Sequence, residues 1–200
     1  MEPPIDRTTL EAALHMSGAP SSDFDLNPDF SGAVTGDLRA AGVLIPIMDH
    51  PKGPRLVLTK RSSALKHHPG QIAFPGGRVD PTDTDPIDAA LRESEEEIGL
   101  PREIVDVIGT LPTHETVTRF QIYPVLGWIR DDFVPIAEPG EVSEIFTVPM
   151  NHVLNADNFN VQSRLWCGQK RSFFTVPYGP YYIWGATARI LRGLADRVQL

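Results

Sequence analysis

Three glutamates in the segment Arg92–Glu97 have the spacing that brings side chains together on a helix. Glu93, Glu96 and Glu97 stand at positions i, i+3 and i+4, which lie on one side of the helical cylinder. Each close pair of like charges costs about 0.2–0.5 kcal/mol, so stability alone does not favour this arrangement. Mg²⁺ or Mn²⁺ prefers carboxylate oxygens and would remove the repulsion. The segment therefore predicts a metal site, and a solvated acidic helix face is the alternative.

The charged residues around this segment are separated by sign along the chain. Between Arg55 and Arg78 every charged residue is a cation, and between Val79 and Leu100 every charged residue except Arg92 is an acid. Cations bind phosphates and carboxylates bind metals, so a basic block beside an acidic block suits a phosphate-plus-metal site. Chance clustering on a surface is the alternative.

The composition limits the class of protein. A chain of 200 residues with 41% hydrophobic and 22% charged residues suits one domain with an ordinary core. The net charge of −8 argues against non-specific nucleic-acid binding, and the apolar runs are too short to span a bilayer. The first residues lack a secretory signal. Cys167 is the only cysteine, which excludes an internal disulfide, suits a reducing cytosol and is more typical of a buried hydrophobe than of a nucleophile. We therefore expect a cytoplasmic protein without nucleic-acid or membrane partners.

The pattern of apolar residues and turn signals predicts alternating strands and helices. We expect an N-terminal arm over 1–37 with a short helix near 9–16, and a domain over 38–200. A helix should begin at Asp85, with Pro86 in its first position, and end at Gly99. Its predicted inward stripe is Ile87, Ala90, Leu91, Ser94 and Ile98. Predicted strands are 41–48, 55–58, 72–74, 104–111, 120–129 and 145–148, with a hairpin of 173–176 and 181–183 and a closing helix over 186–198. These elements predict an α/β sandwich around a mixed sheet.

Residues in and around the acidic helix resemble the Nudix box. They are Gly77, Asp83, Arg92-Glu93, Glu96-Glu97 and Gly99-Leu100. The chain departs from the family pattern at Asp83, where Glu is usual, at Ser94, where an aliphatic residue is usual, and by one extra residue before Arg92. The resemblance implies an α/β/α Nudix fold and metal-dependent hydrolysis of a nucleoside diphosphate linked to another group.

A second segment is similar to the motif that precedes the Nudix box in coenzyme A pyrophosphatases. It runs Leu58-Thr59-Lys60-Arg61-Ser62, then Lys66, Gly70 and Phe74-Pro75-Gly76-Gly77. The resemblance spans roughly 38–195 and implies cleavage of coenzyme A, or its acyl derivatives, into 3′,5′-ADP and 4′-phosphopantetheine. A Nudix pyrophosphatase acting on ADP-sugars or other nucleoside diphosphate derivatives is one alternative, and a non-catalytic nucleotide sensor is another. The family also implies a homodimer.

Physical chemistry and the resemblance together assign roles near the metal. Glu93 and Glu97 are the expected metal ligands, and Glu96 is expected to bind a second metal or orient water. Arg92 should hold one of these glutamates through a two-point bond. Gly76 and Gly77 would let the backbone approach metal and phosphate.

The remaining roles are assigned to residues outside the helix. Arg61 and Lys66 are expected to bind substrate phosphates. Glu141 and Glu144 are candidates for the general base, with Glu115 and His114 behind them, although a structural role is more typical for the histidine. Phe74 is expected beneath the glycine loop. Tyr181, Tyr182 and Trp184 could stack an adenine, although a core role is more typical.

Overall fold

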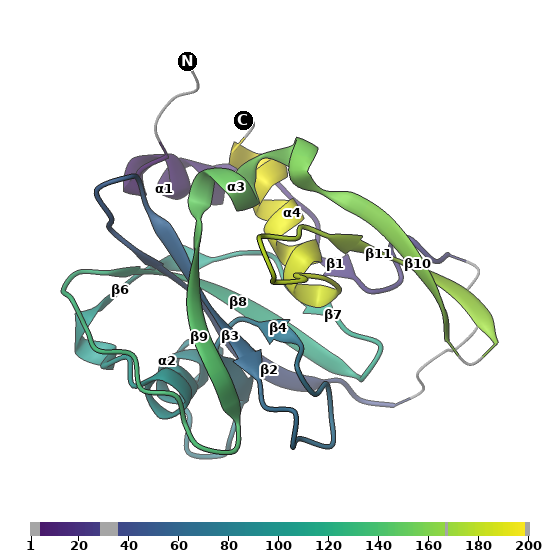
Figure 1. The fold of residues 1–200 in the computed structure, drawn as a ribbon, viewed down its shortest axis with the longest axis horizontal. Coiled ribbons are helices and arrows are strands. Elements are labelled where there is room, and N and C mark those ends of the chain that lie inside the picture. Colours follow the sequence, from purple (N-terminus) through teal and green to yellow (C-terminus); the bar gives the residue numbers. More distant parts are fainter. Residues whose placement is uncertain (1–4, 29–35, 167, 199–200) are drawn as a thin grey trace.

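The computed structural model describes residues 5–28, 36–166 and 168–198, which form a mixed sheet with helices on both faces (Figure 1). Cys167 lies outside the described residues. The nine strands of the sheet are β1 (Ser21–Ser22), β2 (Arg39–Met48), β3 (Arg55–Arg61), β4 (Ile72–Ala73), β5 (Gly76–Arg78), β6 (Val105–Thr110), β7 (His114–Glu115), β8 (Phe120–Ile129) and β9 (Val142–Pro149). The helices are α1 (Arg7–His15), α2 (Pro86–Ile98), α3 (Met150–Leu154) and α4 (Ala186–Val198), with short 3-10 turns at Arg102–Ile104 and Ala156–Asn158. A separate hairpin contains β10 (Asn160–Trp166) and β11 (Gln169–Thr175). The predicted α/β fold around a mixed sheet is confirmed.

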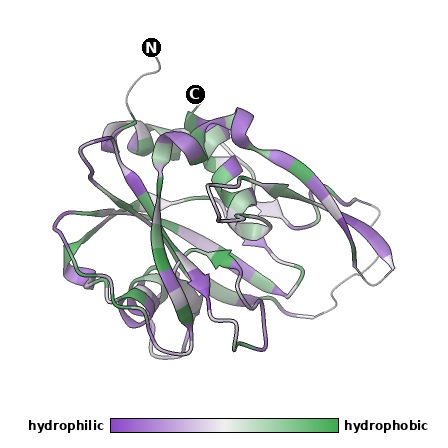
Figure 2. Cartoon of the chain, in the orientation of Figure 1, coloured by the Kyte–Doolittle hydropathy of each residue, from purple (hydrophilic) through white to green (hydrophobic). Residues whose placement is uncertain are grey.

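The centre of the sheet is a long parallel pair. β2 runs parallel to β8 from Arg39 opposite Phe120 to Met48 opposite Ile129. β3 pairs antiparallel with β9, and its register shifts between Lys60 and Arg61. Apolar residues in Figure 2 gather on the strands between the helices. Continuous apolar runs such as the one in β2 are expected in a strand that is covered on both faces.

The two faces of the sheet carry separate apolar clusters. Helix α2 packs on one face, where Ala90 and Ile98 meet Leu44, Val57 and Val125. Helices α1, α3 and α4 cover the other face, in a larger cluster to which α1 contributes Leu10 and Ala13. Figure 1 shows these three helices together and α2 apart from them. The division into an arm over 1–37 and a domain over 38–200 stays a prediction, although α1 shares the core of the domain.

Helix α2 begins and ends where the sequence predicts. The Asp85 carboxylate accepts hydrogen bonds from the N–H groups of Ile87 and Asp88 at 2.8 and 2.9 Å, and Pro86 occupies the first turn. Gly99 ends the helix in the left-handed conformation at φ 67°. The helix also lies close to the sheet, because a Cβ on Gly42 would stand 1.9 Å from the Pro86 carbonyl oxygen.

The predicted hairpin of 173–176 and 181–183 is present as a short antiparallel pairing, in which Thr175 bridges Trp184 and the Val176 N–H donates to the Ile183 carbonyl at 2.9 Å. The regular strand partner of β11 is β10, from Asn160 opposite Thr175 to Trp166 opposite Gln169, and this pairing was not predicted. β10 was not predicted because its exposed residues show no alternation of apolar and polar types. Helix α3 was also not predicted, since five residues carry too little periodicity. No helix among the described residues is both long and apolar enough to cross a bilayer.

Candidate active site on helix α2

Glu97 is a buried carboxylate beside Gly76 of β5. Its residue is 5% exposed, and its Oε2 accepts a hydrogen bond from the Gly76 N–H at 3.2 Å. Burial raises the pKa of Glu97 to about 7, with smaller upward contributions from Glu93 and Glu141, while the Gly76 N–H and Arg61 oppose the rise. The helix stripe predicted from apolar residues did not include Glu97. A carboxylate that is buried with one hydrogen bond is a group that a cation would stabilise.

Glu93 occupies the space that Gly77 leaves open. A Cβ on Gly77 would lie 2.4 to 2.6 Å from the carboxylate atoms of Glu93. Burial raises the pKa of Glu93, and the hydrogen bond from Arg92 works against that rise. Gly76 and Gly77 were expected in a loop, but they lie in strand β5, which pairs with β2. This strand faces the carboxylates of Glu93 and Glu97, and Gly77 is required for space. The approach of the two glycines to a metal and a phosphate stays a prediction.

Arg92 connects several of the predicted residues. Its Nε and Nη2 donate to the two carboxylate oxygens of Asp83 at 2.8 and 3.0 Å. Its Nη1 donates to Glu93 and to Glu96, each at 3.0 Å. The sequence predicted a two-point bond to a glutamate, whereas the planar fork is directed at Asp83 and each glutamate receives one bond. Hydrogen bonding to Asp83 is the main reason that the pKa of Arg92 lies above its usual value.

Asp83, the shorter acid in a position where glutamate is usual, is the anchor of Arg92. It lies in a tight turn in which its Oδ2 accepts from the Asp80 N–H at 2.7 Å. The hydrogen bond from Arg92 holds the pKa of Asp83 below its usual value. The sequence analysis did not assign this role to Asp83. A signal for it was present, since Asp83 is an acid at a position of the Nudix box.

Glu96 differs in its surroundings from the other two glutamates. Its side chain is 58% exposed and is bonded to Arg92. Among the described residues, no three His, Cys, Asp or Glu side chains are gathered as a metal-binding group. The oxygen donors of Glu93 and Glu97 still fit a hard divalent cation, because Mg²⁺ is usually held by one or two carboxylates while waters and phosphates complete its shell. The part of Glu96 in metal binding stays a prediction.

Arg61 is a cation without a carboxylate partner. Its Nε is buried and makes no hydrogen bond within the described part of the chain, and no carboxylate there lies within ion-pair distance of it. Arg61 is nevertheless close to Glu97 and His68, and its positive charge acts to lower the pKa of each. Lys66, its predicted companion, is an exposed residue in the loop after β3. The structure brings Arg61 close enough for its charge to act on Glu97, and the phosphate-binding role of Lys66 stays a prediction.

The two general-base candidates lie on different sides of the sheet. The charge of Glu141 raises the pKa of Glu93 and Glu97, so Glu141 lies near them. Glu144 accepts a hydrogen bond from Tyr181, whose ring stacks on Phe146 at 3.6 Å between centroids. Since Phe146 belongs to the core on the α4 face, Glu144 points away from α2. The geometry favours Glu141, which lies in the turn before β9, whereas Glu144 lies within β9 on the face that α4 covers.

The burial and hydrogen bonds of the remaining candidates are typical of residues that stabilise the fold. His114 is fully buried, with Nδ1 2.9 Å from Ser21 Oγ and Nε2 3.5 Å from Asp23. Glu115 follows it in β7, where its carbonyl accepts from the Asp23 N–H. Phe74 is 5% exposed within the larger core cluster, consistent with its expected place beneath the loop.

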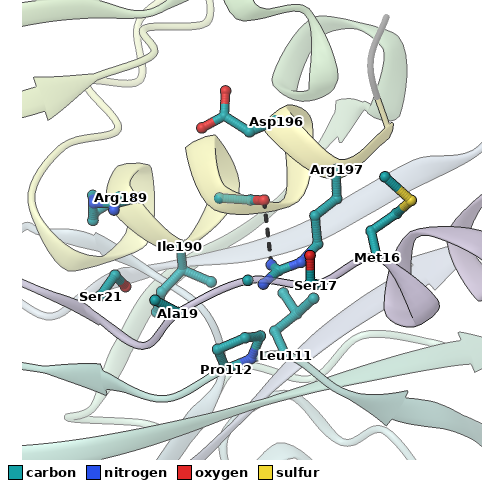
Figure 3. A pocket seen from close by; sticks show the side chains of 12 residues that line it. Met16, Ser17, Ala19, Ser21, Leu111, Pro112, Arg189, Ile190, Asp196 and Arg197 are labelled. Atoms are coloured by element: carbon teal, nitrogen blue, oxygen red, sulfur yellow. Dashed lines mark hydrogen bonds between the residues drawn. The ribbon is translucent and has the colours of Figure 1, made fainter.

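A cavity of about 270 Å³ lies away from these residues, between the chain after α1 and helix α4. Arg197 points into it and donates to the Gly193 carbonyl, while Asp196 points away (Figure 3). None of the predicted site residues lines this cavity.

The chain is similar in sequence to known proteins. Residues 38–166 match the family model of the NUDIX domain. The chain is 45% identical over 160 residues to the uncharacterized Nudix hydrolase NudL of Escherichia coli O7:K1, and 43% identical to that of Cronobacter sakazakii. Each alignment covers 80% of this chain and 83% of the relative.

Solved structures of low sequence identity share the fold. The NUDIX domain of Shewanella oneidensis NrtR, complexed with ADP ribose, has a TM-score of 0.52 at 13% identity, covering 86% of this chain and 95% of that chain. The MutT protein of Methanosarcina mazei Go1 has a TM-score of 0.50 at 18% identity, covering 84% and 99%. At such identities the likeness extends to the fold alone.

Proposed function

Because the chain belongs to the Nudix family of hydrolases, we propose that it cleaves the pyrophosphate of coenzyme A and its acyl derivatives. The products are 3′,5′-ADP and 4′-phosphopantetheine or its acyl form. Water adds its oxygen to one phosphorus, the bond from that phosphorus to the bridging oxygen breaks, and the proton of the water is transferred to a base.

The observation that carries this proposal is the position of Arg61. A partly buried guanidinium with no carboxylate partner keeps its donors for an incoming anion, and its planar fork matches phosphate oxygens. It stands at the end of β3, near Glu97, so a pyrophosphate bound at the α2 carboxylates would lie between them. Arg61 also belongs to the segment that resembles the coenzyme A pyrophosphatase motif, which is why coenzyme A is the preferred substrate.

The other residues of the site have separate roles in the proposed reaction. Glu93 and Glu97 would hold a divalent cation, which would supply positive charge to neutralise the pyrophosphate oxygens. Arg92 fixes the orientation of Glu93 and Glu96, which keeps the carboxylates in place without movement during the reaction. Gly77 leaves space for the Glu93 carboxylate, and Gly76 lets β5 lie against Gly42 and Val43 of β2. Glu141 accepts the proton of the attacking water, since it is the base candidate on the α2 side of the sheet.

A direct test compares three substrates with Mg²⁺ or Mn²⁺. We expect coenzyme A to be cleaved faster than dephospho-coenzyme A, which lacks the 3′-phosphate, and faster than ADP-ribose. In Arg61→Ala, kcat/KM for coenzyme A should fall by about 100-fold, because a charge-assisted phosphate contact is lost. Lys52→Ala removes a cation from the exposed turn before β3 and should leave the rate unchanged. Equal rates for coenzyme A and dephospho-coenzyme A would contradict the assigned substrate.

A second candidate is hydrolysis of ADP-ribose or a related ADP-sugar. The similar NUDIX domain of NrtR was solved with ADP ribose, which makes this compound the relevant competitor. Faster cleavage of ADP-ribose than of coenzyme A would support the hydrolase activity but would show that coenzyme A is not the preferred substrate. Binding of nucleotides without turnover of any of the three compounds would favour a sensor.

A further inference from the structure

An arginine on the β10–β11 hairpin lies over three aromatic rings. The Arg164 guanidinium carbon is 5.0 Å from the centroid of Trp184, 5.6 Å from Phe173 and 5.7 Å from Tyr182. The Phe173 and Trp184 centroids are 5.1 Å apart, and those of Tyr182 and Trp184 are 6.5 Å apart. A flat cationic group thus lies over three neighbouring rings, tilted by 59° and 35° to one another, which come from the hairpin and from the segment before α4 and which we call the aromatic surface.

The aromatic surface is held in place by bonds that do not involve Arg164. Gln162 lies opposite Phe173 in the hairpin register and accepts a hydrogen bond from the Tyr182 hydroxyl at 2.6 Å. Thr175 forms a bridge with Trp184. The rings of Tyr182 and Trp184 are therefore positioned before any ligand arrives.

Two arginines that face each other across the hairpin have different partners. Arg171, which lies opposite Arg164, forms an ion pair with Asp23 at 2.9 Å and connects the hairpin to the N-terminal segment. Arg164 is exposed and forms no ion pair with a carboxylate of the described residues. Because Arg171 makes the structural bond, Arg164 can leave the rings without breaking an ion pair.

The aromatic surface adjoins the strand end that carries Arg61. The Arg61 N–H donates to the Gln71 carbonyl at 2.9 Å, which places Gln71 beside Arg61. The Gln71 side-chain nitrogen is 3.6 Å from the position of a Cβ on Gly185, the residue after Trp184. A single residue therefore bridges the phosphate-binding candidate and the aromatic surface.

We propose that Trp184, Tyr182 and Phe173 form a subsite for the base of a nucleotide, with Arg164 moving aside to stack on the outer face of the base. The inference rests on the proposed function, because a nucleoside diphosphate substrate supplies the base. Aromatic faces bind nucleobases of any sequence through stacking, and arginine adds a cation–π contribution. Tyr181 is not part of the subsite, since its ring is already stacked on Phe146.

The experiment compares AMP with ribose 5-phosphate, two compounds that differ in the base. Equilibrium titrations on the full chain should show that AMP binds more tightly and quenches tryptophan fluorescence. Trp184→Phe keeps an aromatic plane, so it should retain AMP binding and lose the quenching. In Arg164→Ala the affinity for AMP should fall by about tenfold while that for ribose 5-phosphate stays constant.

Lys170→Ala is the matched control. Lys170 lies opposite Leu165 on the other face of the hairpin, so its removal deletes one exposed cation away from the rings. AMP affinity should not change in this variant. Equal binding of AMP and ribose 5-phosphate to the wild type would overturn the base subsite, as would an Arg164→Ala variant that weakens both equally or neither. The titrations measure binding and need no turnover. Failure to cleave coenzyme A would therefore contradict the proposed substrate but would leave the test of the base subsite unaffected.

Discussion

Arg92 and Asp83 form a two-point bond, with Nε to Oδ1 at 2.8 Å and Nη2 to Oδ2 at 3.0 Å. This pair uses one edge of the guanidinium and leaves Nη1 for Glu93 and Glu96. Asp83 therefore orients two glutamates that it does not touch. A residue that orients carboxylates through an arginine acts as a positioning residue.

Asp83→Asn should lower kcat about 10- to 100-fold, because an amide has only one acceptor oxygen and the two-point bond is lost. Steady-state kinetics would measure the loss. Asp80→Asn is the control, since the Asp80 side chain is 51% exposed and stands 4.0 Å from Arg92. A wild-type kcat in Asp83→Asn would show that Arg92 does not need this anchor.

Glu97→Gln should lower the hydrolytic rate by about 100-fold or more while the fold is retained, because the amide keeps the shape and the acceptor for the Gly76 N–H but loses the charge. Saturating Mn²⁺ should raise the melting temperature of the wild type more than that of the variant, since a ligand stabilises the state that binds it.

The control for that variant is Glu95→Gln on the same helix. The Glu95 side chain is 49% exposed and lies 3.9 Å from Arg102, away from Gly76 and Gly77. The Glu95→Gln variant should retain both the hydrolytic rate and the rise in melting temperature with Mn²⁺. If Glu97→Gln and Glu95→Gln behave alike, the assignment of Glu97 as a metal ligand is wrong.

Gly77→Ala should displace the Glu93 carboxylate and reduce the rate about 100-fold, because a shift of about 1 Å in a reacting group has effects of this size. Gly77 is not among the glycines with positive φ. The substitution therefore causes no backbone strain, and its effect comes from the added methyl group clashing with the Glu93 carboxylate. Gly193→Ala, in α4, has its nearest contact at 3.7 Å and should raise stability by about 0.5–1 kcal/mol. Full activity in Gly77→Ala would contradict the close approach of Glu93.

Asp23→Asn should destabilise the fold by about 3 kcal/mol, because a largely buried carboxylate loses its charge beside Arg171. The Asp23 side chain is 13% exposed and also accepts from the Val117 N–H at 2.9 Å. Urea unfolding at neutral pH would measure the change. Asp25→Asn, which breaks a more exposed pair with Arg189, is the control and should have a smaller effect.

The effect of Asp23 should depend on pH. Burial alone would raise the pKa of Asp23, but bonding to His114 and Val117 and the charge of Arg171 outweigh burial and hold that pKa below its ordinary value of 3.8. The ionised group therefore stabilises the fold above that value, and the contribution disappears as the pH falls through the lowered pKa. The stability difference between the wild type and Asp23→Asn should shrink below about pH 4. A difference that stays constant down to pH 3 would contradict the lowered pKa.

The amino-acid sequence by itself determined the elements whose signals are local. Asp85, Pro86 and Gly99 mark the ends of α2, because capping depends on neighbouring residues. Apolar runs marked β2 and β8 for the same reason. The spacing of Glu93 and Glu97, one helical turn apart, follows from helix geometry alone. β10 had no local signal, since its residues are exposed, and its pairing with β11 required the structure.

Only the tertiary structure decided which of several equivalent side chains meet. Glu97 is buried and Glu96 exposed because the sheet, including Gly76 of β5, covers one edge of α2. Asp83 rather than a glutamate receives the fork of Arg92 because a turn places it there. Glu141 lies near the carboxylates of α2, while Glu144 faces the opposite side of the sheet. These outcomes depend on contacts between distant segments, which spacing along the chain does not encode.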